Sequence, residues 1–244
     1  GQYAERDAEA TLKLWQRLSI EIRNQELTEV FNLETDLFPC LVDMRFKGVR
    51  VDLEKAAFIK KDLMAREAKI ISKIKNLTGL EVEIHAARSI AKAFDKLKLP
   101  YDRTAKSNEP SFTKNFLQNH PHPLATCIAD AREINKAHTT FIDSITKHAH
   151  KGRIHADINQ IRSDQGGTVT GRFSMSNPNL QQIPARHPEI GPMIRSIFIP
   201  EEKHKWGCFD YSQQEPRILV HYAKLQNLEG VDEIVDAYNA GDAD

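Results

Sequence analysis

The residues with the clearest chemical potential lie toward the C-terminal end of the sequence. Asp210 follows a short apolar run, and Pro216 is suited to an early position in a helix that continues through Leu225. The pattern predicts a strand over 206–211 followed by that helix. A carboxylate at the end of a strand is held rigidly and can bind a hard divalent cation through oxygen. A capping or loop aspartate is the alternative that spacing alone leaves open.

Two charge patterns surround this junction. Segment 147–195 carries seven Lys or Arg against three Asp or Glu, whereas segment 210–244 carries two against eight. The first could face phosphates and the second a cation, with a solvated surface as the alternative for either. The whole chain has 34 basic and 34 acidic residues, so its net charge of zero hides this asymmetry.

The elements that must position these residues are mostly helical in the first half of the chain. Apolar residues recur every three or four positions, which predicts helices over about 8–22, 33–47 and 52–77. Gly48 and Gly79 supply left-handed stops for the second and third helices, and Asp52 can cap the third. Lysines coat the outside of the third helix, as a solvated helix face does.

Shorter elements follow this helical part. The pattern predicts helices around 86–97 and 112–119 and a long amphipathic helix over about 124–145. Residues 153–159 alternate as a strand does, and a loop rich in Gly, Ser, Asn and Pro follows to Pro192. Long ordered loops are usually functional.

Composition restricts the class of protein. With 244 residues, 40% of them hydrophobic and 28% charged, the chain can form one large domain or two smaller ones. It has neither a membrane-spanning apolar run nor the start of a signal peptide, so we expect a soluble, unexported protein. Cys40, Cys127 and Cys208 have apolar neighbours, which predicts buried thiols without disulfides or a Cys-bound metal.

Two motifs in this order carry a family resemblance. The first is Thr170-Gly171-Arg172-Phe173-Ser174 with the sequence P-N-L-Q-Q-I-P-A-R over 178–186, and the second is D-Y-S-Q-Q-E-P-R over 210–217. Together they resemble the palm of family A DNA polymerases, the bacterial polymerase I and phage type, whose first palm motif reads D-Y-S-Q-x-E-L-R. Gln214 stands at a usually apolar place and Pro216 replaces Leu, but neither departure touches the acidic positions.

Further similarities extend the resemblance over nearly the whole chain. Tyr3-x-x-x-Asp7 resembles the third proofreading-exonuclease motif, residues 33–52 the segment entering the thumb, and residues 132–145 the helix returning from it. The resemblance implies an α+β, mostly helical fold, with a helical thumb and the first part of an antiparallel-sheet palm. The implied domains are the last helix of an exonuclease-like domain at 1–24, the thumb and its palm-anchoring helices at 25–147, and the first part of the palm at 148–244.

The resemblance also implies the roles of residues around the second motif. Asp210, as the catalytic residue, and the backbone carbonyl of Tyr211 match ligands of a site for two Mg²⁺ ions. Ser212 and Gln213 match positions around the metal and the incoming nucleotide. Glu215 matches the steric gate against a ribose 2′ hydroxyl, with an acid that suits a helix N-terminus as its alternative.

The implied DNA-binding residues precede this motif, and they are Arg172, Asn179, Gln181, Gln182 and Arg186. Arg172 matches an arginine that reaches the minor groove near the primer terminus, where acceptors occur on every correct pair. The other four match template- and primer-contacting positions. Turn formation is the alternative for the Asn and Gln residues. His155 and Arg162 are weaker candidates for contacts with the DNA backbone.

The family pattern also requires residues that this sequence lacks. No His-Asp-Glu tripeptide supplies a second metal-binding aspartate, and no basic fingers helix follows Asp210. We therefore expect part of a polymerase that is inactive alone and works with a C-terminal fragment carrying both features. The implied partners are primer-template DNA and deoxynucleoside triphosphates, with no membrane, in the cytoplasm of a bacterial or phage-infected cell. The rival hypotheses are a non-catalytic DNA-binding clamp and a metal-dependent nuclease using Asp7 and Asp210.

Overall fold

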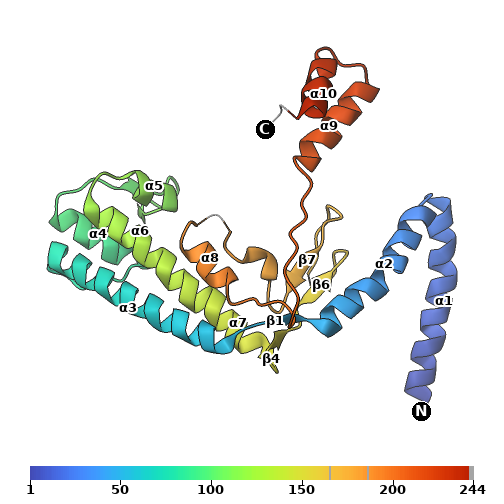
Figure 1. Cartoon of the computed structure of the whole chain (residues 1–244), viewed down its shortest axis with the longest axis horizontal. Coiled ribbons are helices and arrows are strands. Elements are labelled where there is room, and N and C mark those ends of the chain that lie inside the picture. The colour runs from blue at the N-terminus through green and yellow to red at the C-terminus, as the bar shows by residue number, and fades with distance from the viewer. Residues whose placement is uncertain (165, 186, 242–244) are drawn as a thin grey trace. The chain divides into compact units, whose positions relative to one another are not determined.

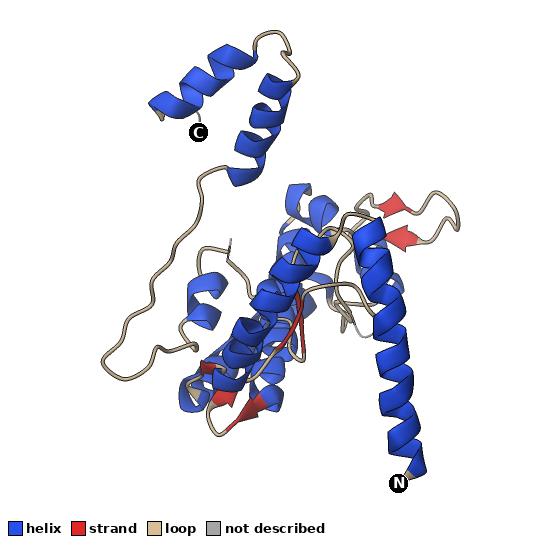
Figure 2. Ribbon diagram, turned by 90° about the vertical axis from the view of Figure 1, so that its right-hand side faces the viewer, coloured by secondary structure: helices blue, strands red, loops and turns tan. Residues whose placement is uncertain are grey.

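The structure is a computed structural model that describes residues 1–164, 166–185 and 187–241. Within it the chain forms two compact units, Gly1–Pro200 and Glu201–Asp244. Helices dominate, and the strands are short and antiparallel (Figure 2). The predicted α+β, mostly helical class is confirmed. In the described part of the chain, no helix combines the length and the apolarity that crossing a membrane requires.

The first unit begins with two long helices, α1 (Gln2–Asn24) and α2 (Thr28–Lys47), where apolar periodicity predicts them. Helix α2 ends at Gly48, which has a positive φ of 64°. A Cβ atom at this position would lie 2.7 Å from both Ile154 O and His155 Nδ1, so the close approach requires glycine. The chain continues directly into strand β1 (Val49–Arg50).

The centre of the unit is an arm formed by α3 (Leu53–Thr78) and α6 (Pro123–Lys136), which lie side by side (Figure 1). Asp52 caps α3 by accepting a hydrogen bond from the Lys55 N–H at 2.8 Å, and Gly79 ends the helix in the left-handed conformation, both as predicted. In the sequence between α3 and α6 come α4 (Ala87–Lys96), the strand pair β2 (Asp102–Arg103) and β3 (Pro110–Ser111), and α5 (Lys114–Asn119).

The predicted single helix over 124–145 is interrupted. Helix α6 passes into a π-helical segment, η1 (Ala137–Ile142), and then into α7 (Asp143–His148). A π-helical turn closes its hydrogen bonds over one residue more than an α-helical turn. The apolar spacing of this segment does not separate the two, so the prediction was right about the direction of the chain and wrong about its hydrogen bonding.

Two hydrophobic cores support the arm. The core at its far end joins α3, α4, α5 and α6, with Phe94, Leu117 and Ile128 among its fully buried residues. The core at its base joins α3, η1 and α8 (Ile190–Arg195), with Leu63 and Ile194 among its buried residues. The arm therefore has a packed interior at both ends.

Two small antiparallel sheets adjoin this base. Strands β4 (Ala149–His150) and β5 (Arg153–Ile154) pair with β1 in the order β1-β5-β4, and β6 (Asp157–Asn159) pairs with β7 (Ser174–Ser176). The predicted continuous strand over 153–159 is wrong at its middle. There His155 donates from Nδ1 to Arg45 O at 2.9 Å, and the chain leaves the first sheet for the second.

In its described residues, 201–241, the second unit consists of a loop and two helices, α9 (Gln214–Leu225) and α10 (Val231–Ala240). Pro216 lies in the first turn of α9, as predicted. The predicted strand over 206–211 is wrong, because a strand needs a neighbour for its backbone hydrogen bonds and none of the described strands pairs with these residues. Cys208 in this loop and Cys40 in α2 are exposed, so the prediction of a buried thiol holds only for Cys127.

Candidate functional site

Asp210 lies in the exposed loop that precedes α9. Its neighbours Phe209 and Tyr211 are 97% and 79% exposed. Gln213 then adopts a left-handed backbone conformation with a φ of 50°, and α9 begins at the next residue. The carboxylate is thus presented by a loop and not by the predicted end of a strand.

Arg217 and Tyr238 hold the residues that follow this loop. The Arg217 Nε donates to Ser212 O at 3.0 Å, and its guanidinium lies 4.6 Å from the centre of the Tyr238 ring. The Tyr238 hydroxyl donates to Gln213 Oε1 at 3.1 Å, while Glu215 is exposed in the first turn of α9. Neither Arg217 nor Tyr238 was predicted as a site residue, although the arginine that ends the second motif was an available signal.

The metal ligands expected at Asp210 are only partly present. Its carboxylate and the Tyr211 carbonyl are the hard oxygen ligands that Mg²⁺ prefers. Within the described residues, however, no group of three or more His, Cys, Asp or Glu side chains is arranged to hold a metal ion. The type of donor fits Mg²⁺, but the number of protein ligands does not make a complete site.

Arg172 lies at the C-terminal end of the loop between β6 and β7. The Thr168 hydroxyl donates to Arg172 O at 2.7 Å, and Gly171 has a positive φ of 74°, which together fix the turn before β7. The Arg172 residue is exposed. The Gln181 side-chain amide donates to Phe173 O at 3.1 Å and so joins the two parts of the first motif.

Three other predicted DNA-binding residues lie in a short 3-10 helix, η2 (Leu180–Gln182), and at its N-cap. Asn179 Oδ1 accepts from the Gln181 N–H at 3.0 Å, so Asn179 does form the turn that was its alternative role. Gln181 and Gln182 are exposed. Arg186 lies outside the described residues. The first unit thus brings the two parts of the first motif together, and the second unit carries the Asp210 motif.

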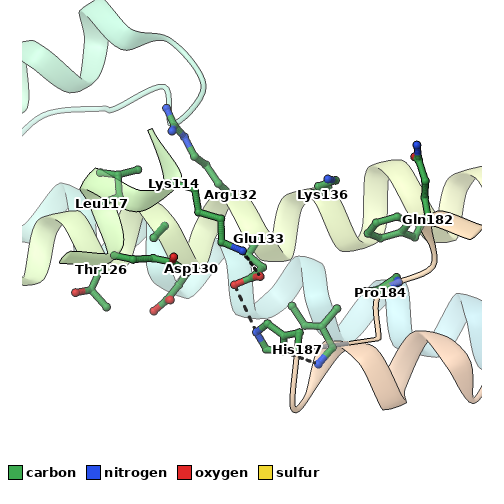
Figure 3. Close-up of a pocket in the computed structure, with 14 residues that line it drawn as sticks. Lys114, Leu117, Thr126, Asp130, Arg132, Glu133, Lys136, Gln182, Pro184 and His187 are labelled. Atoms are coloured by element: carbon green, nitrogen blue, oxygen red, sulfur yellow. Dashed lines mark hydrogen bonds and ion pairs between the residues drawn. The ribbon is translucent and has the colours of Figure 1, made fainter. Parts of the chain in front are cut away.

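A pocket of about 490 Å³ opens beside η2, lined by residues of α5, α6 and η1 and by Gln182, Pro184, His187 and Ile190 (Figure 3). Glu133 forms an ion pair with Lys114 there, with 3.6 Å between the carboxylate and Nζ, and its carboxylate also lies 3.5 Å from His187 Nε2. Burial, with the nearby charge of Glu133, raises the pKa of Asp130 above its ordinary value. Lys114, Asp130, Glu133 and His187 were not predicted as site residues, whereas Gln182, which also lines the pocket, was among the predicted DNA-binding residues. The available sequence signal was the presence of charged residues along the helix over 124–145.

Arg132 lines the same pocket but has a structural task. Its guanidinium donates to Ile84 O at 2.5 Å and to Phe112 O at 2.7 Å, which joins α6 to the segments on either side of α4. Burial lowers the pKa of this arginine. Its donors are therefore engaged within the far end of the arm.

Comparison with protein families places these motifs in context. The model of DNA polymerase family A matches residues 54–241, a range that includes both motifs. The chain belongs to DNA polymerase family A. The resemblance drawn from the two motifs is confirmed.

Two relatives show how much of a family A polymerase the chain spans. It is 36% identical over 235 residues to the DNA-directed DNA polymerase of Pseudomonas phage M6 and covers 35% of that protein. It is 33% identical over 221 residues to the thermostable DNA polymerase I of Thermus aquaticus and covers 26% of it. These alignments include 92% and 88% of the present chain. The chain thus spans about a third of the phage relative's length.

A solved family A structure shares the fold. The POL domain of Pol1 from M. smegmatis, in complex with DNA primer-template and dNTP, matches with a TM-score of 0.67 and 26% sequence identity. The match covers 82% of this chain and 34% of that one.

Proposed function

We propose that this chain is the part of a template-directed DNA polymerase that supplies the thumb, the primer-template contacts and one metal-binding aspartate. The single observation that carries the proposal is the family A match over residues 54–241, which includes both motifs. The enzyme adds deoxynucleotides to the 3′ end of a primer. The bound DNA primer-template and dNTP in the M. smegmatis structure support the same substrates here.

The domain boundaries form part of this proposal. Residues 1–24 are the last helix of an exonuclease-like domain, 25–147 the thumb with its anchoring helices, and 148–244 the first part of the palm. The arm of α3 and α6 supports the thumb assignment because a separate core at its far end makes it a stiff projection. A stiff projection can hold duplex DNA without losing much order when it binds.

Asp210 is the proposed catalytic residue. With the Tyr211 carbonyl it would hold Mg²⁺ together with ligands from outside this chain, and the bound metal supplies Lewis-acid stabilisation for phosphoryl transfer in a two-metal site. Ser212 and Gln213 border the nucleotide, in the conformation that Arg217 and Tyr238 fix. Glu215 lies where it can exclude a ribose 2′ hydroxyl.

The proposed DNA contacts come from the first motif, through Arg172, Asn179, Gln181, Gln182 and Arg186. The described members of this set lie close together, and the bond from Gln181 to Phe173 links the two parts of the motif. The N-cap made by Asn179 uses only its Oδ1. Such contacts with sugar, phosphate and minor-groove edges bind DNA with little dependence on sequence.

Asp210→Ala tests the catalytic assignment. In the enzyme assembled from this chain and its proposed C-terminal part, we expect primer extension to be abolished and primer-template affinity to be kept, because the phosphate contacts remain. Asp236→Ala is the matched control, since Asp236 is another exposed aspartate of the same unit. Full extension by Asp210→Ala would overturn the assignment.

A C-terminal fragment with the fingers and the second catalytic aspartate is the proposed protein partner. The second unit supports this, because Leu219, Tyr222 and Leu225 of α9 are all exposed large apolar residues. We expect the two polypeptides to co-purify through an interface on the order of 2,000 Å² and to regain Mg²⁺-dependent nucleotide addition when mixed. A cooperative melt of the chain alone that the fragment leaves unchanged would contradict the partnership.

A non-catalytic DNA-binding clamp is the second candidate function. It is favoured by the lack of a complete carboxylate cluster around Asp210 in the described residues. DNA binding by a mixture that never extends a primer would support the clamp.

A further inference from the structure

Glu189 is an acidic residue three positions after Arg186, just beyond a segment that we assign to DNA binding. Electrostatics alone disfavours an acid beside phosphates. The structure pairs Glu189 with Arg66 of α3, a residue 123 positions away in the sequence. Arg66 also contacts Asp62 at 2.8 Å, and its hydrogen bond to Glu189 holds the pKa of that carboxyl below its ordinary value. The Glu189 carboxylate is therefore bound to helix α3 of the arm.

His187 makes a second connection to the arm. Its Nδ1 accepts from the N–H groups of Glu189 at 3.1 Å and Ile190 at 2.9 Å, so it satisfies backbone donors at the start of α8. Because Nδ1 accepts, the ring proton lies on Nε2, which faces the Glu133 carboxylate of α6 at 3.5 Å (Figure 3). Both helices of the arm are thus tied to the beginning of α8.

Helix α8 in turn fixes the backbone that leads to Arg186. A Cβ atom on Gly191 would lie 3.2 Å from Ala185 O and 3.3 Å from Pro184 O, which shows how closely α8 lies against this backbone. Arg195 Nε donates to Pro184 O at 3.1 Å. Ile190 and Ile194 anchor the other side of the helix in the core. A displacement of α8 would therefore displace Pro184 and Ala185 of the first motif.

We propose that Glu189, through Arg66, is a positioning residue that sets the DNA-binding residues 179–185 against the arm, with Glu133 and His187 as a supporting pair. The inference rests on the proposed DNA-binding function. Glu189 acts through the backbone and contacts no DNA. The Arg66–Glu189 ion pair and the contact between Glu133 and His187 couple the direction of the arm to the place where the primer-template end is held.

A positioning role and a purely electrostatic role of Glu189 predict opposite effects of Glu189→Gln on DNA affinity. The Arg66 and Glu189 side chains are 39% and 59% exposed, and exposed ion pairs contribute little to stability. If Glu189 mattered only through its charge, Glu189→Gln would remove a repulsion and tighten DNA binding. If it positions the segment, the same change weakens binding although the chain becomes more positive.

The experiment measures primer-template affinity of the 244-residue chain by fluorescence anisotropy. We expect Glu189→Gln to weaken binding on the order of threefold to tenfold, and Glu133→Gln to act in the same direction. Glu109→Gln is the matched control, because Glu109 is paired with Arg88 in an exposed ion pair remote in sequence from this segment. The control should leave affinity unchanged or slightly raised. The melting temperature of each variant separates loss of fold from loss of position.

A reversed pair provides the rescue. Arg66→Glu alone should weaken binding, and Arg66→Glu combined with Glu189→Arg should recover most of it when Asp62, which also contacts Arg66, is changed to Asn in both variants, because the exchange then restores opposite charges at the two positions. Binding by Glu189→Gln that equals or exceeds the unmodified chain, or the absence of rescue, would overturn the positioning role. If the unmodified chain does not bind DNA at all, the proposed function fails and the inference falls with it.

Discussion

The arm built on α3 and α6 differs from the helix pair α9 and α10 in how much apolar surface it buries. The arm buries large residues at both ends, among them Phe94 and Leu63. The pair α9 and α10 buries only Val231 among its described residues and leaves Leu219 and Tyr222 exposed. Burial of apolar surface is the main driving force of folding, so the arm can stabilise itself while α9 and α10 depend on further contacts. The difference indicates that the arm is preformed, whereas the part of the site that includes α9 requires further contacts.

Phe94→Ala should give the largest effect in this comparison. Phe94 is fully buried, with its ring 4.9 Å from that of Phe112, so truncation should lower the free energy of unfolding by about 3–5 kcal/mol. Tyr222→Ala, at a residue that is 62% exposed, should change it by less than about 0.5 kcal/mol. Urea unfolding followed by circular dichroism measures both. Similar losses for the two variants would contradict the contrast.

The same contrast separates what the sequence could predict from what it could not. Helix α3 of the arm was predicted closely because its ends carry local signals, Asp52 at its start and Gly79 at its end. The strand over 206–211 was wrong because strands depend on neighbours, which apolar residues alone do not supply. The exposure of Cys208 has the same cause, since it lies in that loop.

The candidate site divides in a similar way. Arg172 and Asp210 could be identified from the sequence because each belongs to a motif of residue types at fixed spacing along the chain. The pairs of Arg66 with Glu189 and of Glu133 with His187 join positions far apart in the chain, and a single sequence holds no sign of them. The π-helical segment was not predicted for another reason, because one additional residue in a turn leaves the apolar pattern nearly unchanged.

Glu67→Gln tests a buried polar network in the arm. Glu67 Oε2 lies 2.6 Å from His138 Nε2, and Glu67 Oε1 accepts from Asn135 Nδ2 at 2.9 Å. Hydrogen bonds to a charged group in a partly buried place are strong, so we expect a loss of about 2–3 kcal/mol in urea unfolding. Glu81→Gln, in an exposed pair with Lys75, is the control and should leave the unfolding midpoint unchanged. An equal midpoint for both variants would show that the network adds nothing.

Glu215→Ala tests the second unit, where we expect an exposed residue to affect nucleotide selection but not the stability of the fold. Glu215 is exposed in the first turn of α9, and interactions of exposed side chains contribute little to stability, so its removal should change the free energy of unfolding by less than about 0.5 kcal/mol. In the assembled enzyme, loss of its bulk should raise ribonucleotide incorporation relative to deoxyribonucleotide on the order of tenfold in single-turnover assays. Glu229→Ala, at another exposed acid of this unit, should leave the ratio unchanged. An unchanged ratio for Glu215→Ala would return this residue to a helix N-terminal role.

Asp52→Ala gives the smallest expected effect and compares how the two regions begin their helices. Asp52 accepts from the Lys55 N–H at 2.8 Å, whereas α9 has no side-chain cap and follows a residue in the left-handed conformation. Loss of an N-cap side chain typically costs about 1 kcal/mol, so Asp52→Ala should lower the unfolding free energy by that amount. Asp52→Asn keeps an oxygen acceptor and should stay close to the unmodified chain in the same urea titration. If Asn lost as much as Ala, the carboxylate charge beside the helix dipole, and not the hydrogen bond, would be the stabilising element.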